Sequence, residues 1–149
     1  MKGKLQKKLI YFAEKHLEKP YKYGAKPCEA PKIFDCSSFT QYLYKRIGIN
    51  LPRNALDQAH LGRRINPQKE DLEPGDLIFI KSSWGRYNPE FPEGIGHVAI
   101  YIGNRKIIHA RWRRNKDGSD DGKVRDDLAT ALLNRKDLIV VKRILSEKK

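Results

Sequence analysis

The chain has 149 residues, of which 39% are hydrophobic and 33% are charged, as expected for a globular domain. Seven Tyr, five Phe and two Trp supply core material, so disorder of the whole chain is excluded. The longest uninterrupted aliphatic run, residues 138–141, is far too short for a membrane span. We therefore expect one domain over residues 1–149, with no membrane span.

The balance of charge is strongly basic, with 31 Lys and Arg against 18 Asp and Glu, a formal net charge of +13. This excess predicts attraction to polyanions but does not distinguish nucleic acid from anionic wall polymers or an anionic membrane face. A solvated basic surface without a partner is the simpler interpretation. No secretory signal is visible at the N-terminus. The protein is therefore expected to stay inside the cell, to leave by another route, or to be a chain from which a signal has been removed.

The first half of the sequence predicts helices. Apolar residues recur at helical spacing at Leu5, Leu9, Phe12, Ala13 and Leu17. They predict a basic amphipathic helix over residues 2–19, followed by a proline-containing loop over 20–34. Asp35 is predicted to cap a second helix over residues 36–47, and a third, short helix is expected within 52–62.

The second half predicts strands. Short apolar runs indicate strands at residues 77–80, 97–102, 106–110 and 138–145. Residues 111–123 are expected to form a loop, and residues 126–133 a short helix. Helices followed by strands favour an α+β fold with a mostly antiparallel sheet.

Cys36 and two histidines are the candidate chemical groups. Cys36 begins a predicted helix, where unpaired backbone N–H groups and the helix dipole favour a thiolate. His97 and His109 flank a predicted hairpin with its turn at Gly103-Asn104. A turn there pairs His97 with Ala110, which makes the two histidines diagonal neighbours. A thiol, a base and a group that orients the base are the parts of a nucleophilic triad.

Six sequence blocks occur in an order that resembles the NlpC family of cell-wall cysteine peptidases. They are PYKYGA at 20–25, FDCSSF at 34–39, LPR at 51–53, LEPGDLIF at 72–79, GHVAIYIG at 96–103 and IIHA at 107–110. The resemblance implies a papain-like α+β domain that hydrolyses amide bonds in peptidoglycan stem peptides, most often between D-glutamate and the diamino acid. It implies no metal and no cofactor.

The resemblance also assigns roles to residues. Cys36 matches the nucleophile, His97 the general base and His109 the polar residue that orients His97. Tyr21 matches a tyrosine at the active site and is a possible oxyanion donor beside the Cys36 backbone N–H. The substrate peptide or muropeptide is expected to contact residues near these groups: Asp35, Ser37, Arg53, Trp84 and Tyr87. Asp35 has an equally good interpretation as a plain helix cap.

Some positions depart from the family pattern. Ser38, Ala25 and Ala99 stand where glycine is usual, and all three are small. The segment 81–96, which carries Trp84 and Tyr87, is longer than expected. It is either a wall or lid of the substrate groove or a surface loop anchored by its aromatic residues. The basic run at 111–114 follows His109 and would bring positive charge to the cleft, suited to carboxylate-rich stem peptides or anionic wall polymers.

Three other interpretations stay open. Cys28, Cys36, His97 and His109 lack the close spacing of a structural zinc site. A disulfide between the two cysteines would consume the nucleophile, so Cys28 is expected to be a free thiol. A basic module that binds nucleic acid or wall polymer without catalysis fits the charge, but we find no nucleic-acid-binding signature, so nucleic acid is the less favoured partner.

Overall fold

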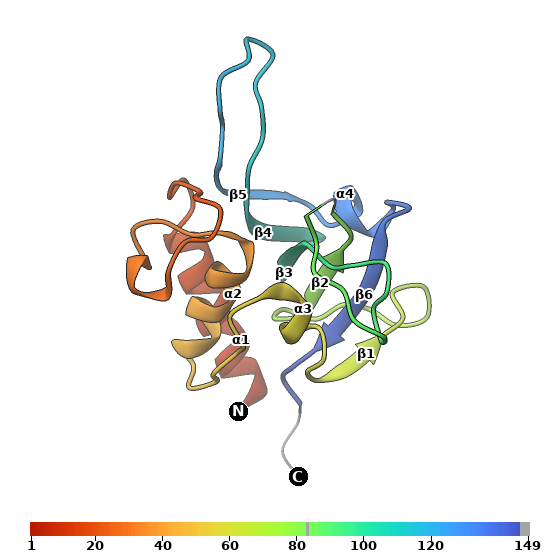
Figure 1. The fold of residues 1–149 in the computed structure, drawn as a ribbon. Coiled ribbons are helices and arrows are strands. Elements are labelled where there is room, and N and C mark those ends of the chain that lie inside the picture. Colours follow the sequence, from red (N-terminus) through yellow and green to blue (C-terminus); the bar gives the residue numbers. More distant parts are fainter. Residues whose placement is uncertain (83, 147–149) are drawn as a thin grey trace.

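The computed structural model describes residues 1–82 and 84–146, and its centre is a six-stranded sheet with the order β1-β6-β2-β3-β4-β5. Every neighbouring pair of strands is antiparallel (Figure 1). The strands are β1 (Arg63–Ile65), β2 (Leu77–Ile80), β3 (His97–Gly103), β4 (Lys106–Arg111), β5 (Lys123–Leu128) and β6 (Leu138–Arg143). The predicted α+β class with an antiparallel sheet is confirmed.

Of the two longer helices, α2 (Cys36–Lys45) packs on one face of this sheet, and α1 (Lys2–Lys15) packs against α2; Figure 1 shows the two helices side by side. Two single-turn helices, α3 (Ala55–Gln58) and α4 (Thr130–Leu133), and a 3₁₀ turn (Pro27–Glu29) complete the helical elements of the described ranges. None of these helices is long and apolar enough to cross a bilayer. The first helix ends at Lys15, earlier than the predicted Lys19. Beyond the end of this helix, Glu18 adopts a φ of 75° and donates its backbone N–H to the carbonyl oxygen of Val124, which turns the chain toward β5.

The sheet is buried on both faces, which explains why its central strands are continuous apolar runs rather than alternating ones. The face toward α2 is packed by Phe39, Leu43, Val98, Ile100 and Ile108. The opposite face is packed by Ile78, Ile80, Ala99, Ile107 and Leu132. Burying a side chain of this size stabilises the fold by about 1.5–3 kcal/mol, so these two layers hold the strands that carry the histidines.

Both edge strands were missed by sequence analysis. Residues 123–128 pair with β4 along their whole length, so the helix predicted over 126–133 is wrong except for its last turn, α4. β5 is polar apart from Val124 and Leu128, and β1 has only three residues. Such edges carry no clear period-2 pattern, and it is pairing with a neighbouring strand that decides their conformation.

The β3–β4 hairpin turns one residue later than predicted. Its turn residues are Asn104 and Arg105, with φ angles of 52° and 62°, and Ile100 pairs with Ile108. In the predicted register, His97 and His109 would have pointed to opposite faces of the hairpin. In the observed register, the alternation of side chains beyond the Ile100–Ile108 pair puts both histidines on the same face.

A buried histidine lies at the end of α1. The His16 side chain packs edge-on against Phe34 and Tyr42, with ring centroids 6.0 and 5.1 Å away. Neither of its ring nitrogens has a hydrogen-bond partner among the described residues. Burial lowers the pKa of His16, and the nearby charges of Lys19, Lys15 and Arg46 add to this effect.

We expect His16 to make the fold sensitive to acid. Because the unfolded chain binds a proton at a higher pH than the buried ring does, stability is lost as the pH falls below about 6.5. His97 and His109, whose pKa values are also lowered, contribute in the same direction. His16→Leu should therefore lose less unfolding free energy than the wild type between pH 8 and pH 5 in urea titrations. An unchanged slope in His16→Leu would contradict this account.

Candidate active site

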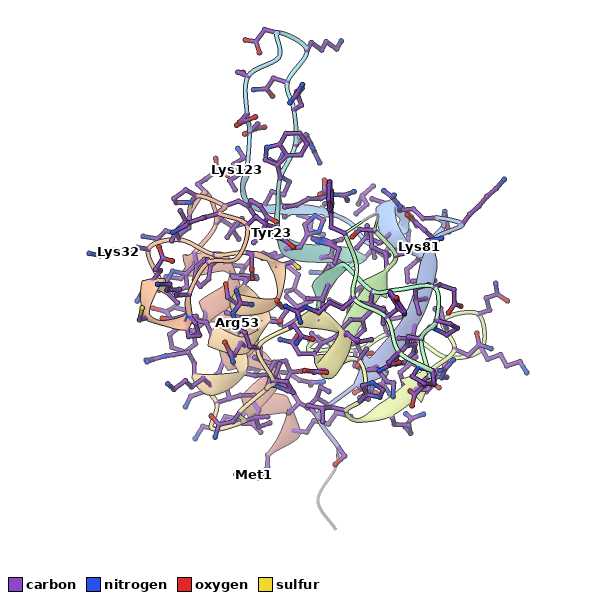
Figure 2. All side chains as sticks on the ribbon, in the orientation of Figure 1. Met1, Tyr23, Lys32, Arg53, Lys81 and Lys123 are labelled. Carbon is purple, nitrogen blue, oxygen red and sulfur yellow. The ribbon has the colours of Figure 1, made fainter. Side chains whose placement is uncertain are left out.

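A cavity of about 810 Å³ lies between the helical part of the molecule and the end of the sheet. The helical wall includes Tyr21, Cys36 and Arg53, and the sheet wall includes His97 and Arg111. In Figure 2, Tyr23 and Arg53 mark the helical side of the cavity and Lys81 marks the sheet side. Cys36 and His97, which are 61 residues apart in the chain (97 − 36), thus line the same cavity.

Cys36 is the first residue of α2, and its position depends on how that helix begins. The Asp35 carboxylate accepts the Ser38 N–H at 2.8 Å, and the Ser38 hydroxyl accepts the Asp35 N–H at 2.9 Å. This reciprocal capping box fixes the first turn. Arg53 holds the same carboxylate through two contacts of 2.7 and 3.2 Å, so Asp35 is both a cap and one half of an ion pair.

The Cys36 sulfur lies against the residue that precedes His97. Sγ is 3.8 Å from the carbonyl oxygen of Gly96. Only glycine fits at position 96, because a Cβ there would lie 1.7 Å from Ser82 Oγ and 3.1 Å from the Gly85 Cα. This close packing fixes the start of β3, and His97 is the first residue of that strand, at the end of the sheet where the cavity opens.

Two hydrogen bonds connect His97 to a carboxylate across three strands. Nε2 of His97 lies 2.7 Å from Nδ1 of His109, and Nε2 of His109 lies 2.7 Å from Oδ2 of Asp127. His109 is fully buried, and Arg113 contacts the same carboxylate oxygen at 3.6 Å. Each hydrogen bond joins diagonal neighbours on adjacent strands, the first on β3 and β4 and the second on β4 and β5.

This chain of bonds sets the protonation of both rings. An ionised carboxylate only accepts, so His109 donates from Nε2 and its neutral Nδ1 must accept. That Nδ1 then receives the proton on Nε2 of His97, which leaves Nδ1 of His97 as the basic nitrogen. The hydrogen bond from His109 holds the pKa of Asp127 below its ordinary value, despite the opposing effect of partial burial.

The surroundings of the thiol and the imidazole favour the neutral form of each. Burial raises the pKa of the Cys36 thiol to about 12, with a further rise from Asp35. Burial also lowers the pKa of His97 well below 6.5. Both shifts oppose transfer of the proton from sulfur to nitrogen at rest, because the thiolate and the imidazolium that it would create are both charged and buried.

These shifts favour a thiol and a neutral imidazole at rest, whereas the helix position alone predicts a thiolate. A charge at a helix terminus gains about 0.3–1 kcal/mol from the dipole, which is too little to offset the burial of the sulfur. The backbone hydrogen bonds to the sulfur from Val98 and Ser37 lower the pKa of Cys36, but burial outweighs them.

The other predicted site residues are only partly brought together. Tyr21 and Ser37 line the cavity with Cys36, and burial raises the pKa of Tyr21, so its hydroxyl remains a proton donor. Trp84 lines the cavity but is 83% exposed. Tyr87 lies outside it, in a smaller adjoining depression. Cys28 is an exposed free thiol.

The segment 81–96 combines the two roles that its sequence suggested. It forms part of the sheet wall through Arg86 and Ile95, among others, while Phe91 is buried and anchors it. Asn88 adds a contact of 2.6 Å to His60. Ser83 of this segment lies outside the described residues.

Asp127 is the residue that sequence analysis missed. The sequence predicts a short helix over residues 126–133, which gives Asp127 no place on a strand beside His109. Val124, Asp126 and Leu128 share one face of the strand, and that face mixes apolar and charged residues, so the sequence offered no period-2 signal here. A strand there would have placed Asp127 on the face of β4 that carries His109.

A helix that presents a buried thiol at its first turn, packed on an antiparallel sheet that carries a histidine pair, defines the papain-like α+β class. The sequence model of the NlpC/P60 family matches residues 18–124, and the chain belongs to this family. The fold and family that the sequence motifs implied are thereby confirmed.

Individual relatives agree with this assignment. The chain is 39% identical over 103 residues to the "Probable endopeptidase p60" of Listeria innocua, which covers 69% of this chain and 19% of that protein. It is 35% identical over 104 residues to the "Gamma-DL-glutamyl hydrolase" of Bacillus subtilis, covering 68% of this chain and 22% of that protein. The chain thus spans about a fifth of the length of these relatives.

Solved structures share the fold. An NlpC/P60 family protein from Bacillus cereus superposes with a TM-score of 0.69 at 28% identity, covering 95% of this chain and 40% of that one. The peptidoglycan hydrolase RipB from Mycobacterium tuberculosis gives a TM-score of 0.69 at 24% identity, covering 98% and 67%. The similarity to RipB extends to the fold alone.

We expect Asp127→Asn to disturb the tautomer of His109. An amide is uncharged and can donate as well as accept, so it no longer forces the proton onto Nε2 of His109. ¹⁵N NMR of the ring nitrogens should show one His109 tautomer in the wild type and a mixture in the variant. Asp126→Asn, at the neighbouring exposed position, should keep the wild-type spectrum. A His109 ring unaffected by Asp127→Asn would contradict the proposed direction of the hydrogen bonds.

The neutral resting site predicts a distinctive pattern of alkylation. Between pH 6 and pH 7, iodoacetamide should modify the exposed Cys28 faster than Cys36, with each site followed by mass spectrometry of peptides. The rate at Cys36 should keep rising about tenfold per pH unit beyond pH 8, because only the thiolate reacts. A rate at Cys36 that reaches its plateau below pH 7 would instead indicate a preformed thiolate–imidazolium pair.

Proposed function

We propose that the protein is a cysteine peptidase that hydrolyses the amide bond between D-glutamate and the diamino acid of peptidoglycan stem peptides. One observation carries this proposal: a single cavity contains the Cys36 thiol and the His97 imidazole, and His97 is oriented by His109 and Asp127. Family membership and the name of the Bacillus subtilis relative support the choice of bond.

Acylation begins with proton transfer from the thiol. As the sulfur of Cys36 attacks the carbonyl carbon, Nδ1 of His97 takes its proton, so that charge develops only during the attack. The imidazolium is stabilised through His109 by the Asp127 carboxylate. His97 then gives the proton to the departing amine, and a thioester to Cys36 remains.

The negative charge on the attacked oxygen needs donors within the cavity. The backbone N–H of Cys36 is one, because the first N–H groups of a helix have no partner within the helix. The Tyr21 hydroxyl is the second, and its raised pKa keeps it protonated. Water activated by His97 then attacks the thioester and releases the acid.

The acyl part of the substrate is expected to lie along the helical wall. Asp35 and Ser37 flank the nucleophile there, and Arg53 donates to the Ser37 hydroxyl at 2.9 Å as well as to Asp35. The Arg53 guanidinium also donates to the carbonyl of Ala25. Because both terminal nitrogens of its guanidinium already donate within the protein, Arg53 supports this wall by positioning Asp35 and Ser37 rather than by binding substrate charge directly.

Cys36→Ala tests the proposal directly. The wild type should release new amino groups from muropeptides, with products identified by mass, and the variant should release none. Loss of the base in His97→Gln should lower kcat/KM by about 10³-fold or more. Cys28→Ala, which removes the other thiol, should retain wild-type activity. Hydrolysis that persists in Cys36→Ala would rule out the nucleophile and with it the proposed mechanism.

A further inference from the structure

The sheet wall of the cavity carries an excess of positive charge. It contains four cationic side chains and one carboxylate, Asp137: the cations are Lys81, Arg86, Arg111 and Arg135. The helical wall is different, because its two charged side chains, Asp35 and Arg53, neutralise each other. An anionic group in the cavity would therefore be attracted to the side on which His97 lies.

Of these four cationic residues, Arg111 is the one best placed to bind an anionic ligand. Arg135 is bound by Asp137 through two contacts of 2.7 and 2.8 Å, so its charge is compensated. Arg111, by contrast, makes no ion pair with a carboxylate in the described part of the chain, although it is half-buried. Partial burial of an unpaired guanidinium is unfavourable, and a carboxylate from outside would relieve it.

Arg111 lies close to the proposed catalytic base, His97. Arg111 follows His109 by two residues on β4, so both side chains lie on the same face of the hairpin as His97. The charge of Arg111 contributes to the lowered pKa of His97, in keeping with a short separation. Since His97 protonates the departing amine, a group bound by Arg111 belongs to the leaving fragment.

We propose that Arg111 binds a carboxylate of the leaving residue, the residue whose amine is released on hydrolysis. This inference rests on the proposed function and specifies which substrates that function prefers. The planar guanidinium matches a carboxylate with two parallel hydrogen bonds, which a lysine at this position would not reproduce. Stem peptides whose leaving residue carries a free carboxylate are then better substrates than those in which it is amidated.

Four synthetic γ-D-glutamyl peptides test this inference. Their leaving residue carries a side-chain carboxylate or carboxamide, combined with a C-terminal carboxylate or amide, which separates the two possible sources of the charge. Arg111→Gln should lower kcat/KM by about 10- to 100-fold for peptides with the recognised carboxylate, and leave the amidated counterparts within about twofold. Arg111→Lys should recover part of the loss.

Arg64→Gln is the matched control, because it removes an exposed arginine on β1, outside the cavity, and should change none of the four rates. Equal losses on carboxylate and amide peptides in Arg111→Gln would show that the residue acts on His97 or on the fold, and would overturn the inference.

A binding measurement separates this inference from the proposed function. Calorimetric titration of the Cys36→Ala protein with the same uncleaved peptides should show tighter binding of the carboxylate forms, lost in Cys36→Ala/Arg111→Gln. If the wild type cleaves none of the peptides but this preference is present, the proposed function fails and the carboxylate site stands. If the peptides are cleaved but affinity does not depend on Arg111, the carboxylate site is overturned.

Discussion

The two hydrogen bonds that run from His97 through His109 to Asp127 are the constraint on which the rest of the site depends. A neutral imidazole has one donor and one acceptor, so a carboxylate at one end imposes a direction on the whole chain of bonds. The direction makes one particular nitrogen of His97 basic. The two hydrogen bonds also require β3, β4 and β5 to keep their register, because a slip of one residue would turn one of the three side chains to the other face of the sheet.

The same site is built to carry little charge before substrate arrives. The sulfur is buried, His97 is buried, and Asp35 is occupied by its cap and by Arg53. Charge separation is therefore postponed until the thiol attacks, when the developing imidazolium can use the carboxylate two bonds away. The one pronounced excess of charge in the cavity is the positive charge of the sheet wall around Arg111. The leaving fragment of a substrate would lie against this wall.

Sequence analysis succeeded where a feature is local. The start of α2, its cap at Asp35 and the position of Cys36 depend on four consecutive residues, and all were predicted. It failed where a feature depends on distant pairing. The role of Asp127 could not be predicted, because β5 is a polar edge strand whose conformation is set by β4, and the turn at Asn104-Arg105 shifted the predicted register. The burial that raises the pKa of Cys36 against the effect of the helix dipole is a property of the assembled cavity and cannot be predicted from the helix start alone.

The connection between β4 and β5, residues 112–122, projects as a long arm from the body of the molecule (Figure 1). It joins the strand of His109 to the strand of Asp127, yet the pairing of those strands fixes the two residues below its base. Because the entropy of closing a loop grows slowly, doubling its length adds only about 0.6 kcal/mol. The length and sequence of the tip around Gly118 can therefore vary. A foreign epitope or a whole domain inserted there would leave the hydrogen bonds from His97 to Asp127 intact.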